Sequence, residues 1–325
     1  MITFALALDL ATGRIDDVRY LEEALTRHAD ASQVVWIDLE SPAESELEAL
    51  RAAFGFHALT LEDCLHLHQR PKIEHHDGHS FIVLYAFEPT DGPEGEWGAR
   101  EVMLFLGDRF VISIHPQPCQ AITLAGERWQ LLPGLEREAA AYLAYLIIDA
   151  AVDTYFPRTE ALTDRLEDLE NDIVAGATHA VLTEVMRLKR QTLAVRRLVT
   201  PLRDIFLSLM RGPGSHFGTA TYAYFQDVLD HLLRITDNLD IQRDVLASAM
   251  DLHMSAMANR TNETMKKLTV ASTILMTCAL IAGIYGMNFR VLPELTWQYG
   301  YQWALGLMAG AAVVLLGLFR WRGYV

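Results

Sequence analysis

An asparagine closes a long uncharged segment near the C-terminal end of this 325-residue chain. The segment ends in Gly286, Met287 and Asn288, and Glu294 is the only acid in the loop that follows. An amide at the end of a membrane-depth helix marks either an ion pathway or a contact between helices. A symmetric ring of such oxygens can select a cation. The spacing leaves a second interpretation equally open, in which Asn288 caps the helix and Gly286 ends it.

Two charge-free runs surround this motif. Residues 268–289 and 295–319 contain no Asp, Glu, Lys or Arg. Each run is long enough to cross a hydrocarbon core, which takes about 20 helical residues. A buried hairpin in a soluble core is the weaker alternative, because core helices seldom stay uncharged for so long. We therefore predict transmembrane helices at 268–289 and 301–320, joined by an external loop at 290–300.

The charges that flank these spans predict their orientation. Basic residues precede the first span and follow the second: Arg260, Lys266, Lys267, Arg320 and Arg322. Cytoplasmic flanks carry the excess of Lys and Arg, so both ends of the hairpin are expected inside the cell. The N-terminal segment lacks the basic start of a secretory signal and reaches Asp9 early. We expect a multi-pass protein of the inner (plasma) membrane with both termini, including a basic tail at 321–325, in the cytoplasm.

The part of the chain before the spans has the composition of an acidic soluble protein. It holds 41 of the 42 acids against 24 Lys and Arg. Cys64, Cys119 and Cys278 lie far apart, so they predict neither a disulfide framework nor a zinc knuckle. We expect no nucleic-acid partner.

Residues 1–135 have the pattern of a mixed α/β domain. The runs "VVWIDL" and "SFIVLYAF" are typical of strands. "EVMLFLGDRFVISIHP" predicts a hairpin that turns at Gly107-Asp108. In "SPAESELEALRAAF", Ser41 is the expected N-cap and Pro42 the first helical residue. Strands with helices between and after them predict an α/β/α layered domain.

Residues 136–267 have a helical pattern. Leu162, Leu166, Leu169 and Ile173 fall on one stripe, and "GPGSHFG" at 212–218 is the clear break. From Thr219 to Ala282 there is neither Pro nor Gly. The sequence therefore predicts a stalk helix of about 65 residues, roughly 100 Å long, that continues into the first span.

The ordered set of motifs in this chain resembles the CorA family of magnesium channels. "YGMN" closes the first span and "PEL" follows in the loop. Further stretches resemble the family in its order: "WIDLESP", "HALTLEDCLHLHQRPKIE", "DAAVDTYF", "LKRQTLAVRRLVTPLRD", "YFQDVLDH" and "NRTNETMKKLT". A lone "GMN" is a weak signal, whereas this set covers nearly the whole chain. The resemblance implies a homopentameric funnel of cytoplasmic domains around a pore lined by the first span, with the lipid bilayer and divalent cations as its other partners.

The resemblance also implies roles for residues along the pore. Asn288 would form the external ring that holds hydrated Mg²⁺, with Gly286 and Met287 beside it. The expected constrictions, from the cytoplasmic mouth outward, are Asn262, Met265, Leu268 and Met276. The alternative interpretation is that these side chains only pack the span against its neighbours. The chain departs from some members at Thr277, Cys278 and Ala279, where a hydroxyl ring is missing at 279. Glu294 either collects cations outside or stabilises the loop.

The resemblance also implies that acidic residues in the soluble part regulate the pore by binding Mg²⁺. Asp63 and Asp227 match positions that in the family bind Mg²⁺ between neighbouring subunits and hold the pore shut. Glu62 and Asp149 match accessory ligands. A solvated surface charge is the ordinary fate of each. The acids between 160 and 172 are interpreted first as a solvated helix face and second as an attractor of cations.

Two other functions stay open at this point. Six histidines between 57 and 79 offer a zinc site, and the superfamily includes ZntB-type zinc transporters: His57, His66, His68, His75, His76 and His79. The motif "GMN" favours Mg²⁺, Co²⁺ or Ni²⁺ over Zn²⁺. The third hypothesis is a membrane-tethered binding domain. No Walker A or HExxH motif occurs in the sequence, and we expect no enzyme. The small-residue pattern from Gly306 to Gly310 is expected to pack the second span against the first.

Overall fold

The computed structural model describes residues 2–18, 20–90, 97–130, 132–175, 179–210, 218–287 and 297–324. The chain divides into two compact units. One unit comprises Met1–Glu170 with Thr183–Ala247, and the other comprises Asn171–Leu182 with Ser248–Val325.

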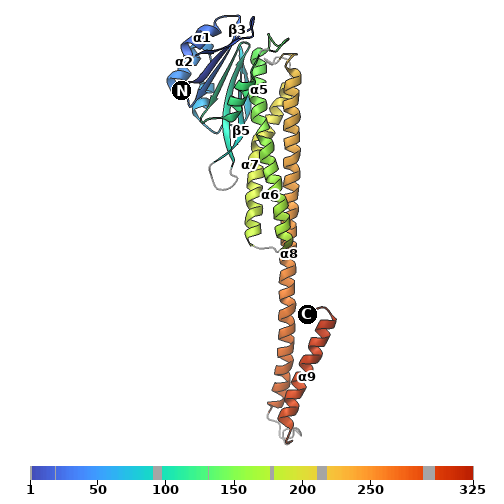
Figure 1. Cartoon of the computed structure of the whole chain (residues 1–325). Helices are drawn as coiled ribbons and strands as arrows, with labels where there is room; N and C mark the ends of the chain where they lie inside the picture. The colour runs from blue at the N-terminus through green and yellow to red at the C-terminus, as the bar shows by residue number, and fades with distance from the viewer. Residues whose placement is uncertain are drawn as a thin grey trace. The chain divides into compact units, whose positions relative to one another are not determined.

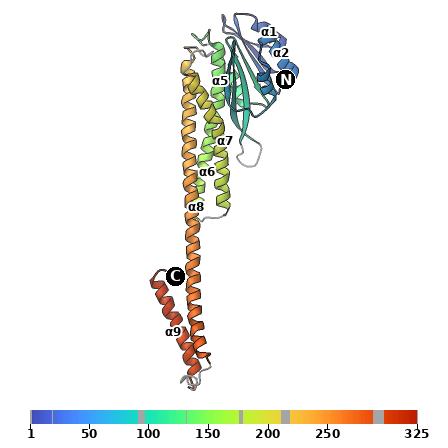
Figure 2. The same cartoon turned by 180° about the vertical axis from the view of Figure 1, so that it is seen from behind.

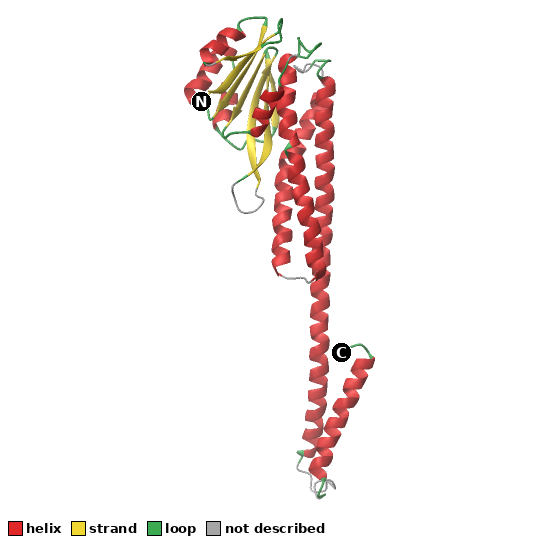
Figure 3. Ribbon diagram, in the orientation of Figure 1, coloured by secondary structure: helices red, strands yellow, loops and turns green. Residues whose placement is uncertain are grey.

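A seven-stranded mixed sheet organises the first unit (Figure 3). Its strands are β1 (Ile2–Asp9), β2 (Ile15–Val18), β3 (Gln33–Glu40), β4 (Lys72–His76), β5 (His79–Pro89), β6 (Trp97–Gly107) and β7 (Phe110–His115), in the order β2-β1-β3-β7-β6-β5-β4. The pairing of β3 with β7 is parallel, and the other neighbouring pairs are antiparallel. Leu106 of β6 opposes Val111 of β7 across the predicted turn, which confirms the hairpin.

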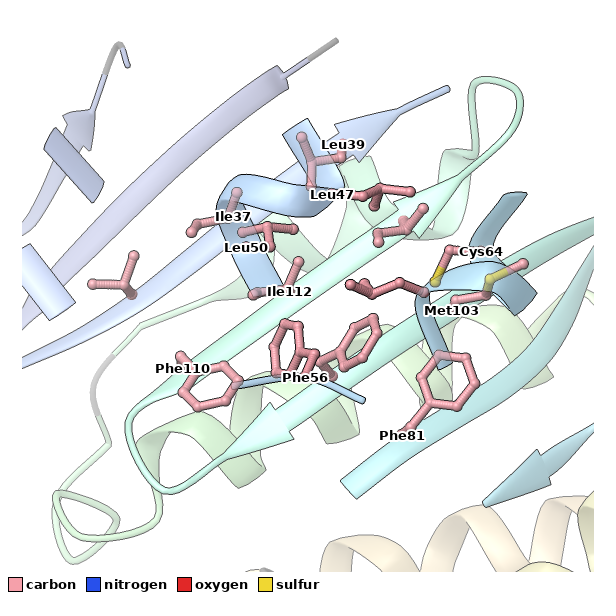
Figure 4. Close-up of a cluster of buried hydrophobic side chains, with 14 of the residues drawn as sticks. Ile37, Leu39, Leu47, Leu50, Phe56, Cys64, Phe81, Met103, Phe110 and Ile112 are labelled. Atoms are coloured by element: carbon pink, nitrogen blue, oxygen red, sulfur yellow. The ribbon is translucent and has the colours of Figure 1, made fainter. Parts of the chain in front are cut away.

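Helices cover both faces of this sheet, as the α/β/α prediction requires (Figures 1 and 2). One face carries α1 (Leu21–His28), α2 (Glu44–Phe54) and α3 (Ala58–Leu65), and the other carries α4 (Gln120–Arg128) and α5 (Ala139–Asp153). Successive strand residues point to opposite faces. Ile37 therefore joins Leu50, Phe56 and Phe110 in the cluster of Figure 4, while the Trp36 ring lies edge-on to Trp129, just after α4.

The start of α2 differs from its prediction. The helix begins at Glu44 with Ala43 as N-cap, so Ser41 as N-cap was wrong. Ser41 has a φ of 47° and donates its N–H to the carbonyl of His115 on β7. The Glu46 carboxylate instead accepts the Ala43 N–H at 2.9 Å. Because this hydrogen bond to the end of β7 holds the backbone of Ser41, the helix begins two residues later than predicted.

Long helices follow the sheet: α6 (Tyr155–Ala175), α7 (His179–Leu209), α8 (Tyr222–Tyr285) and α9 (Gly300–Trp321). The predicted stripe of Leu162, Leu166, Leu169 and Ile173 is buried, and the acids between 160 and 172 are exposed. Within the first unit, Gln242 of α8 donates to the Thr159 carbonyl of α6 at 2.8 Å. Helix α8 has 64 residues, about 96 Å at 1.5 Å per residue. The predicted stalk helix is confirmed.

Within the described ranges, three helical segments are long and apolar enough to cross a membrane. In Ala139–Ile173 the apolar window is 78% buried, so its side chains already form a protein core. The corresponding windows of α8 and α9 are 11% and 0% buried. Apolar helices with exposed side chains suit a lipid environment. Helix α8 covers residues 268–285 of the first predicted span, and α9 covers the whole of the second.

Candidate metal centre

Asp149 is a carboxylate in the last turn of a helix that is otherwise almost wholly apolar. Its neighbours Ile147, Ile148, Ala150 and Ala151 are buried, and Asp149 itself is 8% exposed. Burial, together with the charge of Asp153, raises the pKa of Asp149 to about 6. An isolated buried carboxylate is costly, so the position calls for a partner.

Helix α8 brings an acid and a histidine to that carboxylate. Asp227 and His231 are four residues apart and therefore share one face of the helix. Their ligand atoms and that of Asp149 all lie within 4.8 Å of one another. This is the only group of three or more His, Cys, Asp and Glu side chains with such spacing in the described ranges.

The distances leave room for an ion between the side chains. His231 Nδ1 lies 4.0 Å from Asp149 Oδ1 and 3.5 Å from Asp153 Oδ1, and its Nε2 lies 3.9 Å from Asp227 Oδ1. Nδ1 is buried and makes no hydrogen bond to any part of the chain that the structure describes. Carboxylates suit Mg²⁺, and an added imidazole suits Co²⁺, Ni²⁺ and Zn²⁺. The donor set therefore fits a divalent cation.

The structure thus joins two of the four predicted regulatory acids and adds a candidate ligand that the prediction missed. The missed residue is His231, with Asp153 beside it. The signal was present in the sequence as Asp227 and His231 at i, i+4 spacing in "DVLDH".

Asp63 and Glu62 lie elsewhere on the first unit. Both are on α3, where Asp63 accepts from the Lys72 ammonium at 2.6 Å. Lys72 also contacts Glu74 at 2.6 Å. Glu62 is exposed. Within this single chain neither acid joins the group of Asp149, Asp227 and His231.

The predicted pore residues all lie on the second unit's part of α8. Met265, Leu268 and Met276 are 59%, 63% and 72% exposed, and Asn262 is exposed as well. At 100° per residue the four fall within about 120° of the helix circumference, so they share one face. The Thr277 hydroxyl, in contrast, donates to the Thr273 carbonyl of its own helix at 2.8 Å.

The helix ends where the glycine motif begins. The last residue of α8 is Tyr285, and the Gly286 N–H donates to the Ala282 carbonyl at 2.9 Å. Met287 is 48% exposed. Asn288 and Glu294 lie outside the described residues.

The six clustered histidines do not form a metal centre in the described part of the chain. The rings of His57, His76 and His79 stack, with centroids 6.4 and 4.9 Å apart. His66 Nδ1 contacts the Glu62 carbonyl of its own helix at 2.9 Å. The backbone N–H of His68 donates to the Glu101 carboxylate at 2.6 Å. His75 Nδ1 lies 2.9 Å from the Ser80 hydroxyl.

The glycines of α9 correct another prediction. A Cβ added at Gly306 or Gly310 would meet no atom within 4 Å. The residues of α9 with reduced exposure are Gly300, Ala304, Met308, Ala311, Ala312, Leu315 and Phe319. The helix therefore turns a different stripe inward, and the expected close packing through Gly306 and Gly310 was wrong.

A buried Ser-His-Asp set in the sheet offers no catalytic site. Asp38 accepts from the Ser113 hydroxyl and lies 3.1 Å from His115 Nε2. The three side chains are at most 3% exposed. Asp38 separates serine from histidine, so His115 does not activate the hydroxyl, and no substrate reaches it.

Comparisons with known proteins identify the family of this chain. A sequence profile described as "CorA-like Mg2+ transporter protein" matches residues 31–320. The chain is 34% identical over 289 residues to the "Putative metal ion transporter YfjQ" of Bacillus subtilis, covering 89% of each chain. It is also 34% identical over 300 residues to the "Cobalt/magnesium transport protein CorA" of Thermotoga maritima, covering 92% of this chain and 85% of that one.

Solved structures show the same fold. The complete CorA magnesium transporter of Methanocaldococcus jannaschii matches with a TM-score of 0.80 at 22% identity, over 100% of both chains. The ZntB cytoplasmic domain of Vibrio parahaemolyticus matches with a TM-score of 0.61 at 13% identity, over 80% of this chain and 98% of that one. The second likeness concerns the fold alone. The profile match over most of the chain and the two relatives at 34% identity show that this protein belongs to the CorA-like Mg²⁺ transporter family.

Proposed function

We propose that this protein is a channel that moves Mg²⁺, and also Co²⁺ or Ni²⁺, down the membrane potential into the cytoplasm. The observation that carries the proposal is the group of Asp149, Asp227 and His231 in a chain whose apolar helices are exposed. The Thermotoga relative is named as a cobalt/magnesium transport protein. A potential of about 100 mV favours inward movement of a double charge by roughly 4.6 kcal/mol, so transport needs no ATP site.

Five copies would place the shared face of α8 around a pore. Met265, Leu268 and Met276 would form apolar constrictions that close by dewetting, and Asn262 would lie at the cytoplasmic mouth. At the external end, Asn288 with Gly286 and Met287 would hold the hydrated ion. Mg²⁺ gives up its water reluctantly, so amide oxygens that bind the water shell cost less than direct ligands. Glu294 would collect cations outside.

Regulation would come from metal binding on the first unit, which would lie in the cytoplasm. Asp149, Asp227 and His231 would hold a divalent cation, and Asp63 with Glu62 of a neighbouring copy would complete the site. Without metal these carboxylates repel one another. An ion that binds the closed state more tightly shifts the population toward it by that difference in affinity. Abundant cytoplasmic Mg²⁺ would therefore keep the pore shut.

Zinc transport is the second candidate function. His231 favours it, because an imidazole beside carboxylates binds Zn²⁺ well. In that case Zn²⁺ movement would be coupled to protons.

Metal flux into proteoliposomes tests these proposals. The purified chain is reconstituted with an inside-negative potential and no pH gradient, and entry of Mg²⁺ and Zn²⁺ is followed with trapped dyes. Asn288→Ala is compared with Asn238→Ala, which removes an amide from the part of α8 in the first unit. The channel is supported if Mg²⁺ entry follows the potential and changes in Asn288→Ala but not in Asn238→Ala. Zn²⁺ entry that requires a proton gradient supports the zinc transporter. No flux from intact oligomers would overturn both and leave the tethered domain.

A further inference from the structure

The first unit contains a pocket of about 860 Å³. Of the residues discussed above for transport, only His68 lines this pocket. One wall is the segment from His68 to Pro71, before β4. The opposite wall is α7 between Leu193 and Pro201, and Tyr85 and Ala99 lie between them. This volume falls in the range of about 300–1,000 Å³ found for small-molecule sites.

The segment at the first wall is held in a fixed shape. His68 has a φ of 74°, in the left-handed region. The Glu101 carboxylate accepts the N–H groups of His68 and Gln69 at 2.6 and 2.9 Å. The Tyr85 hydroxyl donates to the Gln69 carbonyl at 2.6 Å. Because Glu101 is only 3% exposed, these bonds hold the backbone beside Arg70 before any ligand arrives.

Three arginines line the pocket, in a protein whose net charge is −15. Arg196 is paired with Asp240 of α8. Among the described residues, no carboxylate lies within 4.0 Å of the guanidinium of Arg70 or Arg197. Two unpaired guanidinium groups at one concave surface match the planar, bidentate geometry of phosphate oxygens.

The remaining surface of the pocket is largely apolar. Pro71, Leu193, Leu198 and Pro201 lie beside the arginines. Pro201 within α7 has no N–H, so it leaves the Arg197 carbonyl without its helical hydrogen bond. The pocket therefore offers cations for an acid group, an acceptor for a hydroxyl and an apolar surface for a ring.

We propose that this pocket binds a nucleotide, with Arg70 and Arg197 holding its phosphate and the proline and leucine side chains contacting its base. The proposal is independent of the transport function, because none of the regulatory acids or pore residues lines the pocket. The ligand class is set by the combination of paired positive charge and apolar surface.

Calorimetric titration of the full-length protein in detergent with AMP tests the proposal. Metal is first removed with a chelating resin. A soluble chelator is avoided because it is a polyanion and would compete with AMP for the arginines. AMP is expected to bind with a Kd below about 1 mM and to bind more weakly as salt is raised. Adenosine lacks the phosphate and inorganic phosphate lacks the base, so each is expected to bind more weakly than AMP.

Variants locate the binding. Arg70→Gln and Arg197→Gln each remove a charge-assisted hydrogen bond, and each is expected to weaken AMP binding about tenfold. Arg190→Gln is the matched control, because Arg190 is exposed on the same helix and lies outside the pocket. No binding of AMP at millimolar concentration, or binding that both pocket variants leave unchanged, would overturn the site. Equal binding of AMP and phosphate would overturn the nucleotide assignment.

Discussion

Asp149 on α5 and His231 on α8 face each other with Oδ1 and Nδ1 4.0 Å apart. Asp149 also has Arg128 nearby, with Oδ2 3.9 Å from the Arg128 guanidinium. Burial raises the pKa of Asp149 to about 6, and His231 Nδ1 is buried without a hydrogen bond. A divalent cation between them would neutralise the carboxylate and accept the imidazole lone pair. This geometry is the basis for our proposal that the two side chains share a metal ion.

The imidazole makes the site sensitive to the identity of the metal. In His231→Ala the carboxylates of Asp149 and Asp227 remain, so Mg²⁺ affinity is expected to change by less than about threefold. Co²⁺ affinity is expected to fall about tenfold, because Co²⁺ gains more than Mg²⁺ from a nitrogen ligand. The measurement is the thermal unfolding midpoint as a function of MgCl₂ and CoCl₂ concentration. An equal loss for both metals would show that His231 supports the site without binding the ion.

The sequence predicted the helices because helical spacing is a local property, but it was the family resemblance that pointed to two members of this site. Charge-free runs predicted the spans, apolar stripes predicted the helices, and the motif resemblance named Asp149 and Asp227. His231 was missed because its role depends on which face of α8 meets α5, and that contact joins segments far apart in the chain. The pairing of Asp63 with Lys72 was not visible either, because it requires α3 to lie beside β4. Ser41 failed as an N-cap for the same reason, since a bond to β7 fixes its backbone.

The stacked histidines provide a test of the zinc hypothesis. His57→Gln with His76→Gln is expected to leave Zn²⁺ affinity unchanged, because the two rings stack at 6.4 Å and form no metal group. Zn²⁺ affinity in His231→Ala should fall about tenfold in the same assay. The readout is Zn²⁺ titration followed by the unfolding midpoint. A loss in the double variant with none in His231→Ala would place the zinc site at the histidine stack and contradict our assignment.

Stability should depend on pH through His115. Burial lowers the pKa of His115, but the hydrogen bond and charge of Asp38, the Gln117 carbonyl and the charge of Glu40 outweigh it, so the folded pKa lies above the ordinary 6.5. A histidine with a raised pKa stabilises the fold below 6.5, and that stabilisation is lost as pH rises through the folded pKa. The unfolding midpoint is therefore expected to fall as pH rises from about 6.5 through the raised pKa of His115.

His115→Gln provides the comparison for this pH dependence. The variant does not titrate, so its midpoint should be flatter over the same range. Asp149 titrates at about 6 and contributes little above pH 6.5. Fluorescence of the buried Trp36, which donates to Ser113 in the same network at 2.9 Å, reports the transition. A slope that persists in His115→Gln would assign it to other groups.

Two glycines in the first unit should respond to alanine in opposite directions. A Cβ at Gly107 would lie 2.2 Å from the Phe110 ring, and that ring is held by His28, Phe54 and Phe56. Gly107→Ala is expected to lower the free energy of unfolding by about 1–3 kcal/mol, because overpacking moves the ring off its site. In α4 a Cβ at Gly126 would meet Trp36 at an ordinary 3.5 Å. Gly126→Ala is expected to raise that free energy by about 0.5–1 kcal/mol through helix propensity. Unfolding midpoints of the two variants check both signs, and a neutral Gly107→Ala would mean that the aromatic cluster yields to the added methyl group.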